Sequence, residues 1–465
     1  MKIALAQTNT TVGDLCGNGQ RILSFARRAA ESGAGAVVFP ELTLTGYPPR
    51  DLLEKQSFLD RAEEHLQQLA AEAANLDVTI ICGAVTRSGI SSGHPIYNSA
   101  AVLEGGRIAF RQHKMLLPTY DVFDEARYFE PAPKQGPLKL GASIAALTIC
   151  EDAWNDKQYW ERPLYSRDPV EELAASGARI LISLNASPYH MGKRRQRHEI
   201  FAATARHFRM PIVYVNQVGG NDHLIFDGSS FAMDADGRVV ACAASFEEDL
   251  VLFDTETLTG DRHENYPEEC EAVYQALVLG TRDYIRKCGF ERVIVGLSGG
   301  IDSALTAAIA TGAVGKENVV GVGMPGPYSS EHSVADARGL AVISDVPKTM
   351  VYSLARVANR RHAGAIPENT FVKPPSAELR PDQKDSDSLP DYAVLDQILE
   401  GYVENNASSQ QIADSLHLSV TLVRDIVNKV DRNEYKRQQA APGLKVTTKA
   451  FGVGRRFPIA QRFSE

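Results

Sequence analysis

The sequence is poor in cysteine for its length, with six residues among 465 and none in a Cys-x-x-Cys pair. This scatter argues against a disulfide framework and against a zinc site, and it predicts a reducing, cytosolic compartment. No apolar run reaches the roughly 20 residues of a membrane span, and the N-terminus turns polar too soon for a signal peptide. We therefore expect neither export nor membrane attachment.

A basic excess is also missing, because 49 lysine and arginine residues face 58 acidic residues and give a formal net charge of -9. Such a chain has no broad positive field to hold DNA or a membrane surface, so small-molecule substrates are the better expectation. What the sequence does have is length. With 465 residues, 44% of them hydrophobic, two sizeable cores are possible, and we predict two domains.

Short apolar runs recur through the first half of the chain and are separated by amphipathic helical stretches such as residues 20–32 and 58–75. The runs are residues 2–6, 36–39, 78–82, 99–103, 145–150, 180–184, 212–215 and 250–253. This alternation predicts an α/β domain with a mostly buried sheet. Residues 99–103 and 107–111 flank a Glu-Gly-Gly turn, which is a hairpin signal and indicates a mixed sheet or sandwich.

A polar stretch without periodicity separates the two predicted domains. We place the first domain at residues 1–255, the linker at 256–271 and the second domain at 272–465. Residues 292–296 and 319–324 are predicted strands on either side of a glycine-rich loop and a helix. This order is the start of a doubly wound, Rossmann-like fold.

Three segments of the first domain each place one reactive residue at or just beyond the end of an apolar run: Glu41, Lys114 and Cys150. Cys150 alone is better interpreted as a buried cysteine at a strand end. The three together supply a base, a cation and a nucleophile. A thiolate attacks an amide carbon, a carboxylate can take the thiol proton, and an ammonium can stabilise the oxyanion.

In order and spacing this set resembles the Glu-Lys-Cys triad of the nitrilase superfamily, and the resemblance covers essentially the whole first domain. It implies an α-β-β-α sandwich in which Cys150 forms a thioester with the glutamine side chain. Glu41 is then the general base, and Lys114 steadies the tetrahedral oxyanion. The stretch after the lysine resembles the glutaminase domains of this family, which implies that Tyr120 and Glu125 line the glutamine pocket.

Residues 187–193 resemble the segment that binds the amino acid backbone of glutamine in these domains. The candidate contacts are Ser187 and Lys193. Residues 193–197 are also a run of charge, so a solvated basic face is the alternative. Both interpretations stay open at this point.

The second domain carries a glycine-rich loop between a strand and a helix, where backbone N–H groups and the helix N-terminus can hold a pyrophosphate. The loop has no Walker lysine. It resembles the Ser-Gly-Gly-x-Asp-Ser loop of the ATP pyrophosphatase family, whose members split ATP to AMP and pyrophosphate. The resemblance implies that Asp302 holds Mg2+, a cation that needs oxygen ligands, on the phosphates. The implied ATP-binding residues are Gly296, Ser298, Gly299, Gly300, Asp302 and Ser303.

Two further segments resemble NAD synthetases in particular. Lys348 stands where that family contacts the dinucleotide phosphates, and residues 373–392 are similar to its mobile active-site loop, which implies phosphate contacts by Lys373 and Ser376. An exposed polar loop is the alternative. The family resemblance implies that ATP adenylates deamido-NAD and that ammonia from glutamine attacks the adenylate to give NAD. It also implies a homo-oligomer.

The chain departs from the NAD synthetase pattern near residues 340/341, where further helices, strands and a Thr-Gly-Asn motif with a second Mg2+ ligand are missing. Either this is a real internal deletion, or residues are absent from the sequence at this point. We favour the second interpretation, because a broken ATP-binding core would leave apolar faces uncovered.

Two other functions remain as alternatives. The chain could be an amidase or nitrilase whose second domain only binds nucleotide as a regulator. It could also be a nucleotide sensor or DNA-binding regulator, because residues 411–427 superficially resemble a helix-turn-helix. We favour neither, since helical hairpins also serve as packing units and the chain is acidic.

Overall fold

The computed structural model of the chain describes the residues 1–263, 266–298, 300–323, 341–372, 389–434, 437 and 440–449. The chain forms two compact units. The first comprises Met1–Asn221 with Phe226–Tyr266, and the second comprises Asp222–Ile225 with the chain from Pro267 onward. Within the described ranges, no helix is both long enough and apolar enough to cross a membrane.

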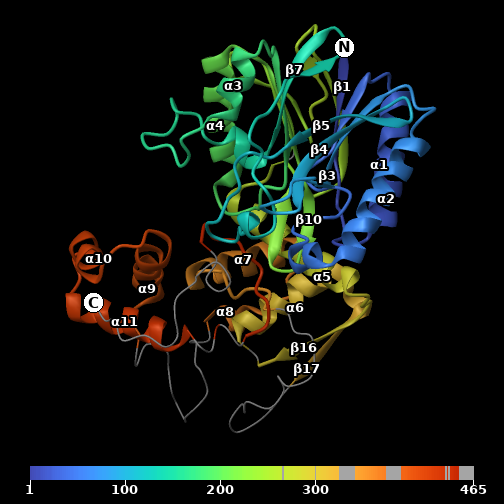
Figure 1. Ribbon diagram of the computed structural model, residues 1–465. Coiled ribbons are helices and arrows are strands. Elements are labelled where there is room, and N and C mark those ends of the chain that lie inside the picture. The colour runs from blue at the N-terminus through green and yellow to red at the C-terminus, as the bar shows by residue number, and fades with distance from the viewer. Residues whose placement is uncertain are drawn as a thin grey trace. The chain divides into compact units, whose positions relative to one another are not determined.

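The first unit is built on two large sheets (Figure 1). In spatial order, the seven-stranded sheet consists of β15 (Thr259–Gly260), β14 (Asp249–Asp254), β1 (Lys2–Gln7), β2 (Ala36–Val38), β3 (Thr79–Arg87), β4 (Ile96–Glu104) and β5 (Arg107–His113). The six-stranded sheet consists of β13 (Val239–Cys242), β12 (Phe231–Met233), β9 (Ile212–Asn216), β8 (Ile180–Asn185), β7 (Ser143–Ile149) and β6 (Leu138–Leu140). A hairpin of β10 (Val218–Asn221) and β11 (Leu224–Asp227) forms a separate two-stranded sheet.

Helices cover the outer face of each large sheet (Figure 1). They are α1 (Leu15–Glu31) and α2 (Gln56–Glu72) on the seven-stranded sheet, and α3 (Pro169–Ala175) and α4 (Lys193–Phe208) on the six-stranded sheet. The short 3-10 helices are η1 (Arg50–Glu54), η2 (Glu125–Arg127) and η3 (Cys150–Ala153).

The alternation of side chains along the strands explains this layering. In β1, Ala4 and Ala6 face the helices, whereas Ile3 and Leu5 lie in the core between the two sheets. Both faces of each sheet are therefore apolar and covered, which requires four layers. The α-β-β-α sandwich implied by the nitrilase resemblance is confirmed.

All eight predicted apolar runs contain strands, and the predicted hairpin is the antiparallel pair of β4 and β5. The predicted linker, residues 256–271, is not free of structure. Gly260 of β15 pairs with Phe253 of β14, and Arg262 forms a bridge with Cys242. A two-residue edge strand is too short to show a sequence period, so it can be recognised only from its pairing with a neighbouring strand.

The second unit begins with α5 (Glu269–Lys287) and one βαβ unit. This unit consists of β16 (Val293–Leu297), α6 (Ile301–Val314), the 3-10 turn η4 (Lys316–Asn318) and β17 (Val319–Gly323), with the two strands parallel. It is the predicted start of the doubly wound fold. In the described part of this unit, the sheet has these two strands, and Ile294, Val320 and Val322 on it are exposed.

The other helices of the described part of the second unit follow β17 in the chain. They are α7 (Lys348–Arg361), α8 (Glu368–Val372), α9 (Tyr392–Leu399), the π-helix η6 (Glu400–Glu404), α10 (Ser409–Leu416) and α11 (Val420–Arg432). His417, with φ 55°, ends α10 and starts the turn into α11. The apolar faces of α9, α10 and α11 pack on one another through Ile398, Ile412 and Val423. The helix-turn-helix-like stretch is thus a packing unit here.

Candidate active sites

Glu41 lies in a segment that runs directly against β3. Gly83 of β3 permits this approach, because a Cβ at that position would lie 2.0 Å from the backbone nitrogen of Leu42. The segment is hydrogen-bonded to β3 on both sides of Glu41, from Gly83 N–H to the Pro40 carbonyl and from Leu44 N–H to the Gly83 carbonyl. Glu41 is completely buried as a result.

Lys114 is the first residue after β5, and its backbone N–H donates to the carbonyl of Asn98 in β4 at 2.8 Å. Glu125 opens η2 and is also buried. The segment after β2, the end of β5 and the 3-10 helix η2 therefore bring Glu41, Lys114 and Glu125 together in the first unit. Glu125, a predicted residue of the glutamine pocket, is part of this charged network, and its contact with glutamine stays a prediction.

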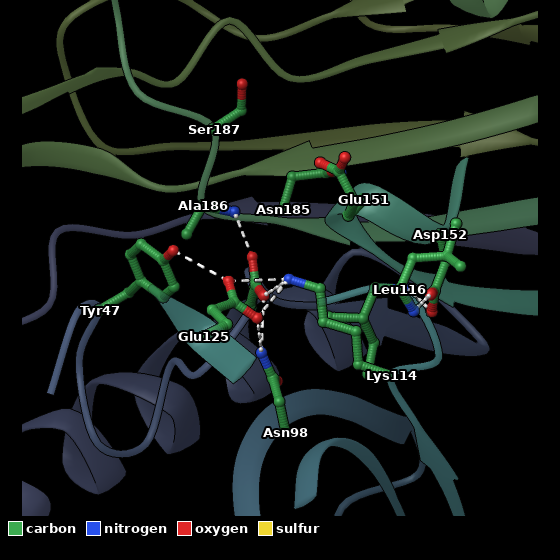
Figure 2. A network of polar contacts seen from close by, with 12 residues as sticks. Tyr47, Asn98, Lys114, Leu116, Glu125, Glu151, Asp152, Asn185, Ala186 and Ser187 are labelled. Carbon is green, nitrogen blue, oxygen red and sulfur yellow. Dashed lines mark hydrogen bonds and ion pairs between the residues drawn. The ribbon is translucent and has the colours of Figure 1, made fainter. Parts of the chain in front are cut away.

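The Lys114 ammonium sits between two carboxylates (Figure 2). Its Nζ lies 2.7 Å from Glu41 Oε1, and 2.9 and 2.7 Å from the two oxygens of Glu125. Asn98 Nδ2 donates to Glu41 Oε1 at 2.7 Å, and the Tyr47 hydroxyl donates to Glu125 Oε1 at 2.9 Å. One buried cation is thus shared by two buried anions, and each anion has a further neutral donor.

The charges in this network shift one another's ionisation. Burial lowers the pKa of Lys114, but Glu125 and Glu41 outweigh it, and the net pKa lies well above the usual value. Burial raises the pKa of Glu125, and Lys114 only partly opposes this. Lys114 is therefore a permanent cation. An ammonium has three N–H donors, and here one goes to Glu41 and two go to Glu125, so one of the Glu125 contacts can be exchanged for an oxyanion while each carboxylate stays bound.

Cys150 is the first residue of η3, directly after β7, and it has a left-handed backbone with φ 43°. A non-glycine residue in this region costs about 1–2 kcal/mol, so the surrounding contacts must hold it there. Burial and the Glu41 charge raise the pKa of the Cys150 thiol, while Lys114 lowers it in part. The resting residue is therefore a thiol that needs a base, and Glu41 is a carboxylate within electrostatic reach.

Asp152 ties the Lys114 segment to this strained turn. Its carboxylate is fully buried and accepts the backbone N–H groups of Met115 at 3.0 Å, Leu116 at 2.8 Å and Ile149 at 3.3 Å. Gln135 Nε2 donates to it at 2.7 Å. Because the donors come from both sides, Asp152 fixes the residue before Cys150 relative to the residues after Lys114.

Asp152 should make the stability of the first unit pH-dependent. Burial raises its pKa from 3.8 to about 6, against the lowering effect of its hydrogen bonds. The folded state therefore keeps a proton that the unfolded state releases, and this stabilisation is present below about pH 4 and lost as pH rises through 6. A two-unit shift corresponds to at most about 3 kcal/mol.

Asp152→Asn removes this titration, so the unfolding free energy of the wild type minus that of the variant is expected to fall between pH 4 and 7. Both tryptophans, Trp154 and Trp160, lie in the first unit, so their fluorescence during denaturation follows that unit alone. A difference that stays constant or rises with pH contradicts the assignment.

A further buried carboxylate, Glu151, follows the nucleophile. The hydroxyl of Tyr120 donates to its two oxygens at 3.1 and 2.9 Å. Burial raises the pKa of Glu151, while Lys114 and hydrogen bonds from Tyr120 and Tyr165 oppose it. Tyr120 is thus brought to the Cys150 turn. Sequence reasoning missed Glu151, although its position next to Cys150 was a signal.

Ser187 and Lys193, the other two predicted glutamine contacts, flank the end of β8 and the start of α4. Ser187 is buried, and its N–H donates to Asn216 Oδ1 at 2.9 Å. Lys193 is half-buried with its Nζ 4.1 Å from the centre of the Trp154 ring, and Trp154 ends the turn that carries Cys150. The structure therefore brings Lys193 to the nucleophile's turn instead of leaving it on a solvated face.

The glycine-rich loop of the second unit connects β16 to α6. Gly296 lies in β16, Gly300 is the N-cap of α6, and Ser303 lies in its first turn. The Ser303 hydroxyl donates to the Gly300 carbonyl at 3.0 Å and lies 3.2 Å from the Ser298 hydroxyl. The loop thus contacts the first turn of the helix, whose N-terminal N–H groups can hold a phosphate. Gly299 lies outside the described residues.

Asp302 and Lys348 contact each other, with Lys348 Nζ 2.5 Å from Asp302 Oδ2. The predicted metal ligand and a predicted phosphate ligand are therefore neighbours. Lys373 and Ser376 lie outside the described residues. Among those that are described, no group of three or more His, Cys, Asp or Glu side chains could hold a metal ion. Mg2+ held mainly by nucleotide phosphates needs only one or two carboxylates, so half-exposed Asp302 fits it.

Comparisons with known proteins cover both units. Residues 2–259 match the carbon-nitrogen hydrolase family, and residues 273–342 and 337–440 match NAD synthase. A glutamine-dependent NAD(+) synthetase from Synechocystis sp. is 40% identical over 553 aligned residues and 99% of each chain. The chain belongs to the glutamine-dependent NAD(+) synthetase family.

Further members of the glutamine-dependent NAD(+) synthetase family agree. The protein of that name from Thermotoga maritima is 35% identical over 100% of this chain and 99% of its own. A solved structure of the glutamine-dependent NAD+ synthetase from Acinetobacter baumannii, in complex with ADP, has a TM-score of 0.70 at 32% identity and covers 98% of each chain. The similarity thus extends over both domains.

The family alignments also contain a gap in this chain. The alignment with the Synechocystis protein has 553 columns for a chain of 465 residues, so at least 88 columns hold no residue of this chain. The two NAD synthase matches meet at residues 337–342. That the missing residues belong to the second domain near 340/341 stays a prediction.

Proposed function

We propose that this enzyme makes NAD by amidating deamido-NAD with ammonia that it cuts from glutamine at Cys150. The observation that carries the proposal is the buried Lys114 ammonium, held by Glu41 and Glu125 beside a strained cysteine. It occurs in a chain similar over both domains to proteins named glutamine-dependent NAD(+) synthetases. The domains are proposed at residues 1–255 and 272–465, joined by the stretch 256–271.

In the proposed glutaminase step, Glu41 takes the proton of the Cys150 thiol, and the sulfur attacks the amide carbon of glutamine. The oxyanion that forms is stabilised by the Lys114 ammonium, which exchanges one of its two contacts with Glu125 for the oxyanion. The carbon–nitrogen bond then breaks, the proton passes from Glu41 to the leaving nitrogen, and ammonia departs from a thioester. Glu41 next takes a proton from water, whose oxygen attacks the thioester and releases glutamate and the thiol.

Recognition of glutamine as an amino acid is assigned to the residues around Cys150. The buried carboxylate of Glu151, with Tyr120, suits the α-ammonium group of the substrate. Ser187 and Lys193 are proposed to bind its α-carboxylate. A site with one buried anion and one cation on either side of the nucleophile favours a zwitterionic amide over a simple one.

In the second domain, the loop with Gly296, Ser298, Gly300 and Ser303 is proposed to bind the ATP phosphates, together with Gly299. Asp302 is the proposed Mg2+ ligand, and the cation supplies charge neutralisation at the phosphates. Lys348, Lys373 and Ser376 are the proposed contacts to deamido-NAD and phosphate. The nicotinate carboxylate attacks the α-phosphorus of ATP, pyrophosphate leaves, and ammonia displaces AMP from the adenylate.

Passage of ammonia between the two reactions without release to bulk solvent is also proposed. In water at neutral pH almost all ammonia is NH4+, which has no lone pair, whereas NH3 released inside protein can remain a nucleophile. A homo-oligomer in the cytoplasm completes the proposal. The alternative, an amidase with a regulatory nucleotide-binding domain, is not favoured, because the similarity to named synthetases spans both domains.

The test supplies ATP, Mg2+ and deamido-NAD with amide-labelled 15N-glutamine and unlabelled ammonium in excess. We expect one labelled NAD, one AMP and one pyrophosphate for each glutamine consumed, as measured by mass spectrometry. ADP as the product, or NAD whose nitrogen comes from the unlabelled pool, contradicts the proposal.

A further inference from the structure

A second buried ion pair lies behind Ser187, outside the network of Lys114. Arg197 of α4 is 1% exposed and Asp227, the last residue of β11, is 0% exposed. Arg197 Nη1 donates to the two oxygens of Asp227 at 2.7 and 2.9 Å, and the Ser229 hydroxyl donates to the same carboxylate at 3.1 Å. Arg197 belongs to the charge run 193–197, yet it is not part of a solvated face. Burying this ion pair costs desolvation free energy, so its presence here suggests a role beyond stability.

The remaining donors of Arg197 all point to the segment that follows β8. Nη2 donates to the carbonyls of Ser187 at 2.8 Å and Pro188 at 3.3 Å, and Nε donates to Ser187 Oγ at 3.3 Å. Asp227 thus binds Nη1 of the guanidinium, and Nη2 and Nε of the same group bind the segment at Ser187. A lysine could not do both, because its ammonium is a single point and not a fork.

The same segment also reaches the catalytic network. Ala186 N–H donates to Glu41 Oε2 at 3.1 Å (Figure 2). The backbone of the segment is held by Asn216 as well as by Arg197, since Ser187 N–H donates to Asn216 Oδ1. Arg197 therefore contacts the Ser187 hydroxyl and the carbonyls of Ser187 and Pro188, whereas Asn216 binds the Ser187 N–H next to Ala186.

The direction of the hydrogen bond between Arg197 Nε and Ser187 Oγ limits how the Ser187 hydroxyl can bind a ligand. A guanidinium only donates, so Ser187 Oγ must accept from Nε and its own hydrogen is directed to another acceptor. A carboxylate oxygen is a strong acceptor for a hydroxyl donor. With Nε on one lone pair of Ser187 Oγ, the hydroxyl keeps a hydrogen that can be donated to such an oxygen.

We propose that Arg197, anchored by Asp227, is a positioning residue for glutamine recognition: it orients the buried Ser187 hydroxyl to donate to the α-carboxylate of glutamine. This rests on the proposed function, because it takes Ser187 as a substrate contact. It predicts a specific defect in glutamine binding when Arg197 changes. The chemistry at Cys150 should be largely spared.

The first test compares Arg197→Lys with Arg195→Lys in the full chain. Arg195 lies on the same helix but is 83% exposed, so it is a matched control. For Arg197→Lys we expect the KM for glutamine to rise at least tenfold, with kcat reduced less than about threefold and the rate of Cys150 alkylation by iodoacetamide within twofold of wild type. Iodoacetamide has no α-carboxylate, so its reaction reports the thiol without the proposed contact. Arg195→Lys should match wild type in all three measurements.

The second test removes both charges with Arg197→Met and Asp227→Asn together, so that no unpaired charge stays buried. The same rise in KM is expected, with unchanged tryptophan fluorescence. An unchanged KM in either variant overturns the inference. So does a parallel loss of alkylation, kcat and fluorescence, which would make Arg197 purely structural. If wild type itself releases no ammonia from glutamine, the proposed function fails instead, so the two failures are distinguishable.

Discussion

Replacing Cys150 with alanine is expected to lower glutamine-driven NAD formation about 10³-fold or more, because no other group can form the thioester. NAD formation from ammonium, ATP and deamido-NAD should stay within about twofold of wild type, since the second reaction uses none of the Cys150 network. The measurement is the initial rate of NAD formation with each nitrogen source. Glutamate release, followed separately, should fall together with the glutamine-driven rate.

The control for this prediction is Cys16→Ser, which removes an exposed thiol from the same unit and should leave both rates unchanged. Equal loss of both rates in Cys150→Ala contradicts separable sites. The ammonium-driven reaction also tests the second domain by itself, because in the proposed mechanism it does not use the first domain. A wild-type chain that hydrolyses glutamine but cannot use ammonium would show that the gap near 340/341 has removed the synthetase reaction and would favour the amidase alternative.

The layers of the first unit can be predicted from the sequence, because an apolar run indicates a buried strand. The continuous apolar runs of β1, β7 and β8 indicate strands that are buried on both faces. The pairing of Thr259–Gly260 is not readable in this way, since two residues have no period. The boundary between the units is therefore less predictable than their cores.

Some residues of the candidate active site can also be predicted from the sequence, and others cannot. Glu41 and Lys114 stand at strand ends, where convergence can be expected from sequence, and the structure joins them at 2.7 Å. Asn98 lies within β4, and its position in the strand gives no sign that its side chain reaches Glu41. Arg197 is hidden in a charge run, and only its partner from a distant strand, Asp227, explains why it is buried. Polar contacts between residues that lie far apart in the chain cannot be predicted from a single sequence.

The Lys114 network makes a second strong prediction. Lys114→Met removes the cation that stabilises the oxyanion, and we expect kcat for glutamine hydrolysis to fall about 10²–10³-fold. The two buried carboxylates then face each other without a counter-ion, so one of them keeps a proton at neutral pH. The acid limb of the kcat/KM profile should therefore move to higher pH. Lys157→Met, which removes an exposed lysine of the same unit, is the control and should change neither value.

Adding Glu125→Gln to Lys114→Met separates the two roles of the lysine. One carboxylate is then left in the network, so the like-charge repulsion disappears and the acid limb should return toward its wild-type position. The rate at the plateau should stay low, because the oxyanion still has no ammonium. If the double variant regains the wild-type kcat, Lys114 serves only to keep the carboxylates ionised. If its acid limb stays displaced, the pH shift in Lys114→Met has a cause other than Glu41 and Glu125 facing each other.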